Sequence, residues 1–140
     1  MRRVRWSGVV VAVVLLVDSS VWVLAKARLG MVAYHAEANE LAVCPAVMNE
    51  VLRGARDSRD YKRIREMFLT LVVLDRDVPL ERFEEAAQLY TRCREAGYTV
   101  RNSFDCLIAA TAIAHDATLL HRDSDFEYIA RVMPLRLQRI

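Results

Sequence analysis

Four acidic residues in this sequence stand where a buried carboxylate would need a positively charged partner. Asp18 and Asp123 each follow a short apolar run of the kind that predicts a buried strand. Glu50 falls on or beside the apolar face of a predicted helix, and Asp105 lies in the first turn of another, on its packed side. In a doubly wound sheet the strand ends and the helix starts share one edge. These carboxylates are therefore expected to lie close together.

A cluster of carboxylates repels itself, so its members have raised pKa values or the cluster binds a cation. An oxygen-only set of ligands, with no cysteine and no histidine pair, favours Mg²⁺ or Mn²⁺ over zinc. A hard divalent ion in an acidic pocket activates water and neutralises the charge of a phosphate. The predicted chemistry is therefore phosphoryl chemistry.

Each acid also has a simpler explanation when it is taken alone. Glu50 at the flank of its helix can reach Arg53 or solvent, which is the more common outcome for a helix glutamate. Asp105 complements the helix dipole, a contribution of about 0.3–1 kcal/mol. These alternatives stay open for the single residues, and the case for a site rests on the set.

The elements that must position these acids fit one α/β domain. A chain of 140 residues with 54% hydrophobic residues can bury a core and is not disordered. We expect residues 1–12 to be an N-terminal extension and residues 13–140 to form the domain. The net charge of +2 does not by itself support nucleic-acid binding. Only Lys26 and Lys62 are lysines, and the arginine excess suits phosphate contacts or reflects codon usage.

The apolar and turn patterns predict strands alternating with helices. The strands are predicted at residues 11–17, 41–44, 71–74 and 117–120, with an edge strand within 134–140. The helices are predicted from Ser19 or Ser20 to near Gly30, weakly at 31–39, at 46–55 and 61–69, from Asp77 and Pro79 to a stop at Gly97, from Asn102 or Ser103 to 114, and at 127–132. The inner stripe of the long helix is predicted as Phe83, Ala86, Ala87, Tyr90 and Cys93.

The N-terminus has some features of a secretory signal. An apolar run at 9–17 precedes Ala25, Lys26 and Ala27, which resemble a cleavage site. Against this interpretation, Asp18 directly follows the apolar run and Lys26 lies inside the cleavage motif. The run is also shorter than the about 20 residues of a membrane span. We therefore expect a cytoplasmic protein without membrane contact.

The cysteines Cys44, Cys93 and Cys106 are odd in number and lack the paired spacing of a disulfide framework or a zinc site. Their apolar surroundings predict buried thiols.

Four segments together carry a family resemblance. Residues 16–22, 49–54, 105–112 and 121–126 read LVDSSVW, NEVLRG, DCLIAATA and HRDSDF. In this order and at this spacing, across roughly residues 14–136, they resemble the successive motifs of PIN-domain ribonucleases. Within that superfamily they most resemble the VapC toxins of toxin–antitoxin pairs. The resemblance implies a three-layer α/β fold with a central, mostly parallel sheet of short strands flanked by helices.

The resemblance also implies a metal-dependent endoribonuclease. By position, Asp18, Glu50, Asp105 and Asp123 match the catalytic and metal-binding acids of the family, with Mg²⁺ as the implied ion and Mn²⁺ as the alternative. Three further residues match motif positions. Asp125 matches a variable acid that contacts the metal site or is an alternate metal ligand, and Ser20 matches the small hydroxyl residue that orients the first aspartate or a metal-bound water. Asn49 matches a polar residue near the site.

Basic residues flank the acids. Arg53, Arg101 and Arg122 are candidates to hold phosphates of the RNA on either side of the cut, or are surface charges. His121 is a proton donor, an RNA contact or, more commonly for a histidine at a strand end, a surface residue. The resemblance implies an RNA substrate, a cognate antitoxin protein and a homodimer.

Two other functions are compatible with parts of the pattern. The same fold would also serve as a non-catalytic module that binds RNA or a protein partner. An aspartyl-phosphate phosphatase with Asp18 as nucleophile is disfavoured, because that class requires a second acid where Ser20 stands.

Overall fold

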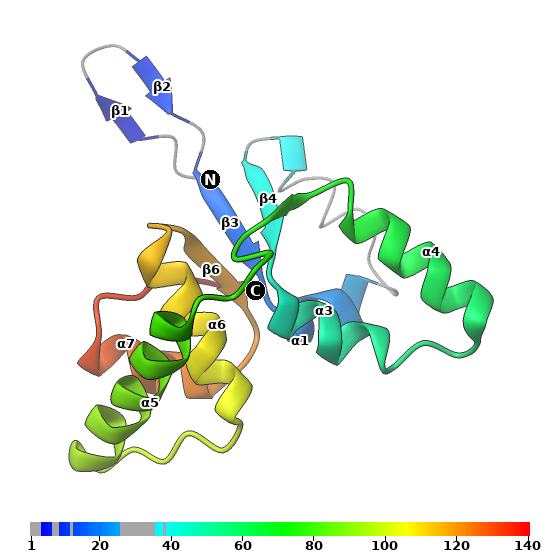
Figure 1. The fold of residues 1–140 in the computed structure, drawn as a ribbon. Helices are drawn as coiled ribbons and strands as arrows, with labels where there is room; N and C mark the ends of the chain where they lie inside the picture. Colours follow the sequence, from blue (N-terminus) through cyan, green and yellow to red (C-terminus); the bar gives the residue numbers. More distant parts are fainter. Residues whose placement is uncertain (1–3, 7–8, 12, 26–35, 38) are drawn as a thin grey trace.

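The computed structural model describes residues 4–6, 9–11, 13–25, 36–37 and 39–140, and its centre is a five-stranded sheet (Figure 1). The strand order is β5-β4-β3-β6-β7, and every neighbouring pair is parallel. The strands are β3 (Val14–Val17), β4 (Glu40–Val43), β5 (Val72–Val73), β6 (Thr118–His121) and β7 (Arg136–Arg139). The predicted strands after residue 40, including the edge strand, are confirmed within a few residues at each end.

The three central strands are buried because helices cover both faces of the sheet, which explains their nearly continuous apolar sequences. The helices are α1 (Ser19–Ala25), α3 (Pro45–Leu52), α4 (Ser58–Phe68), α5 (Leu80–Glu95), α6 (Ser103–Ala114) and α7 (Ser124–Val132). In one group α1 contacts α3 and α3 contacts α4; in the other, α5, α6 and α7 contact one another (Figure 1). Right-handed crossovers on either side of β3 place the two groups on opposite faces. The predicted three-layer fold is confirmed.

Aromatic packing fixes the first helix group against the strand that carries the first acid. The Trp22 ring meets the Phe68 ring edge to face, with the centroids 5.3 Å apart. The Trp22 indole N–H also donates to the carbonyl of Val17 at 3.1 Å. Phe68 is fully buried, so its replacement by alanine is expected to cost about 3–5 kcal/mol.

The apolar run at 11–17 is not one strand. The structure has a separate antiparallel hairpin of β1 (Val4–Trp6) and β2 (Val9–Val11), and β3 begins only at Val14. The hairpin stands away from the sheet in Figure 1. The run was predicted as continuous because its composition does not change where the pairing partner changes. The predicted helix end near Gly30 and most of the weak helix at 31–39 lie outside the described residues.

The predicted inner stripe of the long helix α5 is partly wrong. Phe83 is 52% exposed and Tyr90 36% exposed, and Ala87 is exposed as well. The buried residues are Ala86, Leu89 and Cys93. Ala86 and Cys93 were predicted correctly, and Leu89 replaces Phe83, Ala87 and Tyr90 on the face of α5 that contacts α6 and α7.

All three cysteines are free and buried, as predicted. Burial raises the pKa of the Cys44 and Cys106 thiols to about 12, which keeps them protonated. None of the helices in the described ranges has the length and apolar character of a membrane span.

Candidate active site

Asp18 lies at the point where the strand order reverses between β3 and β6, the position where open α/β sheets bind their ligands. Its backbone N–H donates to the carbonyl of Leu120 at 2.9 Å, which extends the pairing of the two strands. Its own carbonyl accepts the N–H of Val21 at 3.0 Å and so starts α1. The sheet and the helix start therefore fix the backbone of this aspartate.

Ser20 fixes the carboxylate of Asp18. The Ser20 hydroxyl donates to Asp18 Oδ2 at 2.5 Å, and the Ser20 backbone N–H donates to the same oxygen at 3.1 Å. The hydroxyl in turn accepts the backbone N–H of Arg122 at 3.1 Å. The other oxygen, Asp18 Oδ1, is buried and has no hydrogen-bond partner among the described residues.

Glu50 reaches the same place from α3. Pro45 occupies the first turn of this helix, where its missing N–H costs nothing. Glu50 Oε2 lies 3.4 Å from the Ser19 hydroxyl and 3.5 Å from Asn102 Nδ2, while Oε1 is buried with no partner in the described part of the chain. From the sequence, Ser19 and Asn102 were predicted only as possible helix starts. Their location at the same sheet edge was the available signal for this second contact.

Asp105 lies in the first turn of α6, as predicted. The Asn102 side chain caps this helix by accepting the backbone N–H of Phe104 at 3.0 Å. Asp105 is only 5% exposed. The run of small residues behind it, which includes the buried Ala109 and Ala112, lets α6 pack closely and brings the carboxylate inward.

Asp123 and Asp125 enter from the turn after β6. Asp123 caps α7, since its Oδ1 accepts the backbone N–H of Asp125 at 3.0 Å. Asp125 is buried and accepts the backbone N–H of Arg101 at 3.2 Å. The Arg101 guanidinium lies 3.4 Å from the same oxygen, and its side chain is 76% exposed.

The five acids form two overlapping groups. Asp18, Glu50 and Asp105 each offer an oxygen within 4.8 Å of the others, and so do Asp105, Asp123 and Asp125. Asp105 belongs to both groups and lies at the centre of the cluster. The structure thus brings together all five acids that the sequence predicted; below, "the acid cluster" means these residues.

Three members of the acid cluster, Asp18, Glu50 and Asp105, form no ion pair with a basic residue of the described ranges. Burial, and then the charge of Asp18, raises the pKa of Asp105 to about 8. Burial also raises the pKa of Asp18, although the hydrogen bonds from Ser20 oppose it. The pKa of Glu50 is raised by burial and by Asp18. Near neutral pH the cluster therefore retains protons unless a cation takes their place.

A divalent cation fits this donor set. Asp18 Oδ1 and Glu50 Oε1 are buried acceptors that lack donors in the described part of the protein. A buried acceptor without a donor is costly, and a metal ion would remove that cost. The donors are all oxygens, which suits Mg²⁺ or Mn²⁺.

The other predicted residues surround the cluster at different distances. The charge of Arg53 lowers the pKa of Glu50 without outweighing its burial. Arg122 is exposed and reaches the site through its backbone N–H. Asn49 is exposed on α3, and no hydrogen bond between described residues joins its side chain to the acids.

His121 is not a surface residue. Its side chain is fully buried and packs against the Phe126 ring, with the centroids 5.6 Å apart. The backbone N–H of Asp123 lies 3.1 Å from His121 Nδ1. Burial lowers the pKa of the imidazole, so the ring is neutral and holds the turn that presents Asp123. The interpretation as a surface residue was wrong because hydropathy does not reveal a backbone partner two residues away.

Comparisons with known proteins agree with this architecture. The sequence model of the PIN-domain family matches residues 15–132 of this chain. The chain is 37% identical over 129 residues to the VapC ribonuclease Mb1587 of Mycobacterium bovis and to ribonuclease VapC11 of Mycobacterium tuberculosis, with 87% of this chain and 96% of each relative covered.

Solved structures share the fold at lower identity. VapBC from Salmonella typhimurium, solved bound to DNA, matches with a TM-score of 0.75 at 18% identity, over 91% of this chain and 98% of the other. VapBC-1 from nontypeable Haemophilus influenzae matches with a TM-score of 0.71 at 20% identity, over 90% and 97%.

A parallel sheet in this order, with acids gathered at its carboxyl edge, defines a PIN-type α/β protein. The chain belongs to the PIN-domain family and, within it, to the VapC group. The family resemblance drawn from the four sequence motifs is confirmed.

Proposed function

We propose that this chain is a metal-dependent endoribonuclease that acts as the toxin of a toxin–antitoxin pair. The observation that carries the proposal is the acid cluster, with its buried, unpartnered carboxylate oxygens on Asp18 and Glu50. The relatives named as VapC ribonucleases support the reaction class. The similarity to a member of the VapBC family of toxin–antitoxin systems supports the biological role.

In this proposal Asp18, Glu50, Asp105 and Asp123 are the catalytic acids and, with Asp125, the ligands of Mg²⁺ or Mn²⁺. The ion, when bound, would supply an activated water and would neutralise charge on the phosphodiester that is hydrolysed. No side chain needs to act as a nucleophile.

The surrounding residues orient these acids and hold the substrate. Ser20 holds one oxygen of Asp18, so that the other points to a fixed ligand position. Asn102 and Ser19 restrain Glu50 through its Oε2, which leaves Oε1 available to the ion. Arg53, Arg101 and Arg122 are proposed to hold phosphates beside the cut. Asn49, exposed on α3, is at most a peripheral contact.

The proposed macromolecular partners are the RNA substrate, a cognate antitoxin and a second copy of the chain in a homodimer. An arginine of the antitoxin would compensate the acid cluster in place of the ion, because a guanidinium binds carboxylates strongly. The nuclease domain is proposed to span residues 13–140, after an extension of residues 1–12. An RNA substrate and an antitoxin favour the cytoplasm as the place of action.

The test is cleavage of RNA by the purified chain. With Mg²⁺ or Mn²⁺ the protein is expected to cut RNA at preferred positions, and sequencing the new ends identifies the target. Excess EDTA, Asp18→Asn and Asp105→Asn should each lower the rate by about 100-fold or more. Asp77→Asn, at an exposed acid outside the cluster, is the matched control. Full cleavage by the cluster variants, or RNA binding without cleavage, would contradict the proposal and favour a non-catalytic binding module.

A further inference from the structure

Two tyrosines and an arginine form a compact surface cluster outside the acid cluster. The rings of Tyr98 and Tyr128 are stacked, with centroids 5.2 Å apart and planes at 11°. The guanidinium carbon of Arg131 lies 5.6 Å from the Tyr98 centroid and 5.7 Å from the Tyr128 centroid. Arg131 also donates to the Tyr98 hydroxyl at 3.4 Å. We call these three residues the tyrosine platform.

Arg131 differs from neighbouring arginines in its partners. Arg136 pairs with Asp116, and Arg139 pairs with Glu127. Within the described ranges, no carboxylate forms an ion pair with Arg131, whose side chain is exposed and held by the tyrosines. Its position is fixed by the tyrosines, and only the more distant charge of Glu127 acts on it, so the guanidinium remains available to an anionic ligand.

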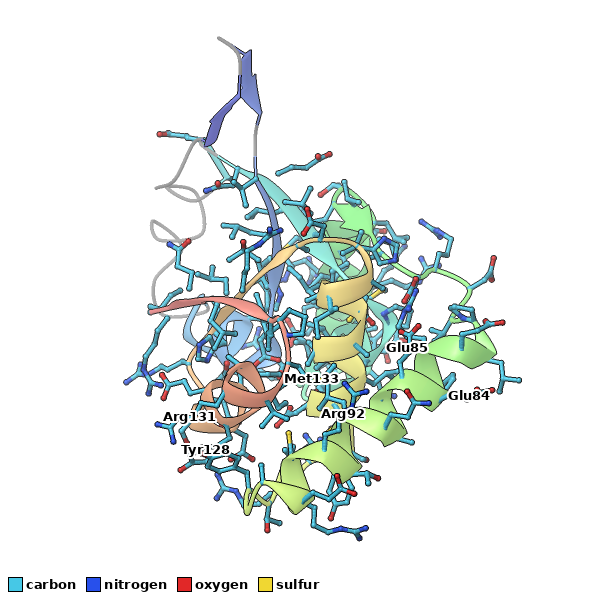
Figure 2. The ribbon with its side chains drawn as sticks, turned by 90° about the vertical axis from the view of Figure 1, so that its left-hand side faces the viewer. Glu84, Glu85, Arg92, Tyr128, Arg131 and Met133 are labelled. Atoms are coloured by element: carbon cyan, nitrogen blue, oxygen red, sulfur yellow. The ribbon has the colours of Figure 1, made fainter. Side chains whose placement is uncertain are left out.

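The tyrosine platform continues directly from the acid cluster along α7. Asp125, Tyr128 and Arg131 follow one another at three-residue spacing, so each lies beside the next across a helical turn. The rise of the helix places Arg131 about 9 Å along the axis from Asp125. Figure 2 shows Tyr128 and Arg131 side by side on α7.

Arg101 connects the two regions. Its guanidinium lies against Asp125, and its side chain is exposed. The hydrogen bond to Asp125 raises the pKa of Arg101, which keeps this guanidinium charged beside the acid cluster. A strand that leaves the acid cluster toward α7 would therefore meet Arg101 first and then the platform.

We propose that Arg101 and the tyrosine platform bind the single-stranded RNA segment beside the scissile phosphate, with Arg101 and Arg131 on phosphates and a tyrosine ring stacked on an unpaired base. The inference rests on the proposed nuclease function and deepens it, because it assigns the substrate segment and the side of the site from which the RNA leaves. Both tyrosines are half-buried, so the stack keeps aromatic surface in solvent.

The chemistry of the tyrosine platform matches single-stranded nucleic acid. Proteins bind such strands by combining aromatic rings for base stacking with basic side chains along the backbone. Tyrosine and arginine are also common in protein interfaces. The RNA assignment is preferred because the platform adjoins the carboxylates proposed to act on a phosphodiester.

The test measures binding of a fluorescein-labelled, single-stranded oligoribonucleotide of random sequence by anisotropy. The full chain carries Asp18→Asn with Mg²⁺ present, and a gel checks that the probe stays intact. Arg131→Gln is expected to weaken binding about 10-fold and to reduce the salt slope by about one. Tyr128→Leu should weaken binding about 10-fold, while Tyr128→Phe, which keeps the ring, should bind like the parent. The control is Arg136 on β7, which is paired with Asp116. Arg136→Gln should change the affinity for the probe by less than about twofold.

A second measurement uses the chain with Asp18 intact. Arg131→Gln should raise KM about 10-fold with kcat nearly unchanged, because Arg131 is remote from the reacting phosphate. The protein could cut RNA while Arg131→Gln and Tyr128→Leu have the same KM and probe affinity as Arg136→Gln. That result would overturn the inference about the tyrosine platform and leave the proposed nuclease function standing.

Two other outcomes are distinct. If the unmodified chain neither binds nor cuts RNA, the proposed function itself fails and the inference fails with it. If Arg131→Gln or Tyr128→Leu changes the mass in light scattering while RNA affinity is unchanged, the platform is a protein interface and the inference is overturned. Thermal melting confirms that each variant is folded.

Discussion

Asp75 and Asp105 are both carboxylates with little solvent exposure, yet their surroundings differ in kind. Asp75, in the turn after β5, accepts from Arg82 Nε at 2.7 Å, and His115 Nε2 lies 2.7 Å from its other oxygen. Burial alone would raise the pKa of Asp75, but the hydrogen bonds from Arg82 and His115 outweigh it, and the pKa is lowered. The pKa of Asp105 is raised by burial and by neighbouring acids.

The same contrast separates Asp60 from Asp18 and Glu50, whereas Asp125 of the acid cluster pairs with Arg101. Asp60, buried in the first turn of α4, lies 2.9 Å from Arg63 and accepts the backbone N–H of Arg56 at 3.0 Å. No arginine or lysine of the described ranges forms an ion pair with Asp18, Glu50 or Asp105. A carboxylate that serves the fold finds its partner within the chain. Acids that lack one are stable together only with protons or an external cation, which is the signature of a binding site.

The largest expected effect separates activity from stability at Asp105. Asp105→Asn is expected to lower kcat/KM for RNA by about 100-fold or more, because the central ligand of both acid groups is lost. In EDTA the same variant should unfold at the same or a higher temperature, since it removes a carboxyl group whose ionisation is opposed by burial and by the neighbouring acids. Steady-state cleavage and thermal melting check the two halves. A variant that loses activity and stability together would place Asp105 with the structural acids.

Asp75→Asn is expected to give the opposite result. It breaks a paired carboxylate whose side chain is 7% exposed, so it should lower the free energy of unfolding by about 2–3 kcal/mol. RNA cleavage at a temperature where the variant is folded should stay within about twofold. Urea unfolding measures the first quantity, and Asp77→Asn is again the matched control. A loss of kcat without a loss of stability would contradict the assignment of Asp75 to the fold and of Asp105 to the site.

Metal binding should stabilise the protein through the acid cluster and should not depend on Asp75. Millimolar Mg²⁺ or Mn²⁺, at about ten times the dissociation constant, stabilises the folded state by about 1.4 kcal/mol and raises the melting temperature by a few degrees. The shift is expected in the unmodified chain and in Asp75→Asn, and it should be absent in Asp105→Asn. An equal shift in all three proteins would mean that the ion binds elsewhere.

The positions of Asp18, Asp105 and Asp123 could be predicted from the sequence, because they depend on residues that are close along the chain. Asp18 and Asp123 could be placed at strand ends because short apolar runs define those ends. Asp105 could be placed in a first helical turn because Asn102 precedes it as a cap. Their convergence then follows from the topology of parallel sheets.

The features that the sequence did not reveal depend on partners far along the chain. His115 and Arg82 reach Asp75 from different helix ends, and no local pattern reports that contact. Ser19 and Asn102 lie 31 and 52 residues from Glu50. The buried face of α5 was misassigned because a mixed helix offers two stripes of similar hydropathy, and only the position of α6 and α7 selects between them.

The smallest expected effect is a pH dependence that belongs to Asp75. The hydrogen bonds from Arg82 and His115 hold its folded-state pKa below the ordinary value of an aspartate, so its contribution to stability is present above that ordinary value and is lost as the pH falls through the lowered pKa. The difference in unfolding free energy between the unmodified chain and Asp75→Asn should therefore shrink as the pH falls below the ordinary range of an aspartate. Urea unfolding across this range measures it. A difference that instead grew as the pH fell would show that Asp75 is destabilised by its charge, as the acids around Asp105 are, and the two groups would no longer be distinct.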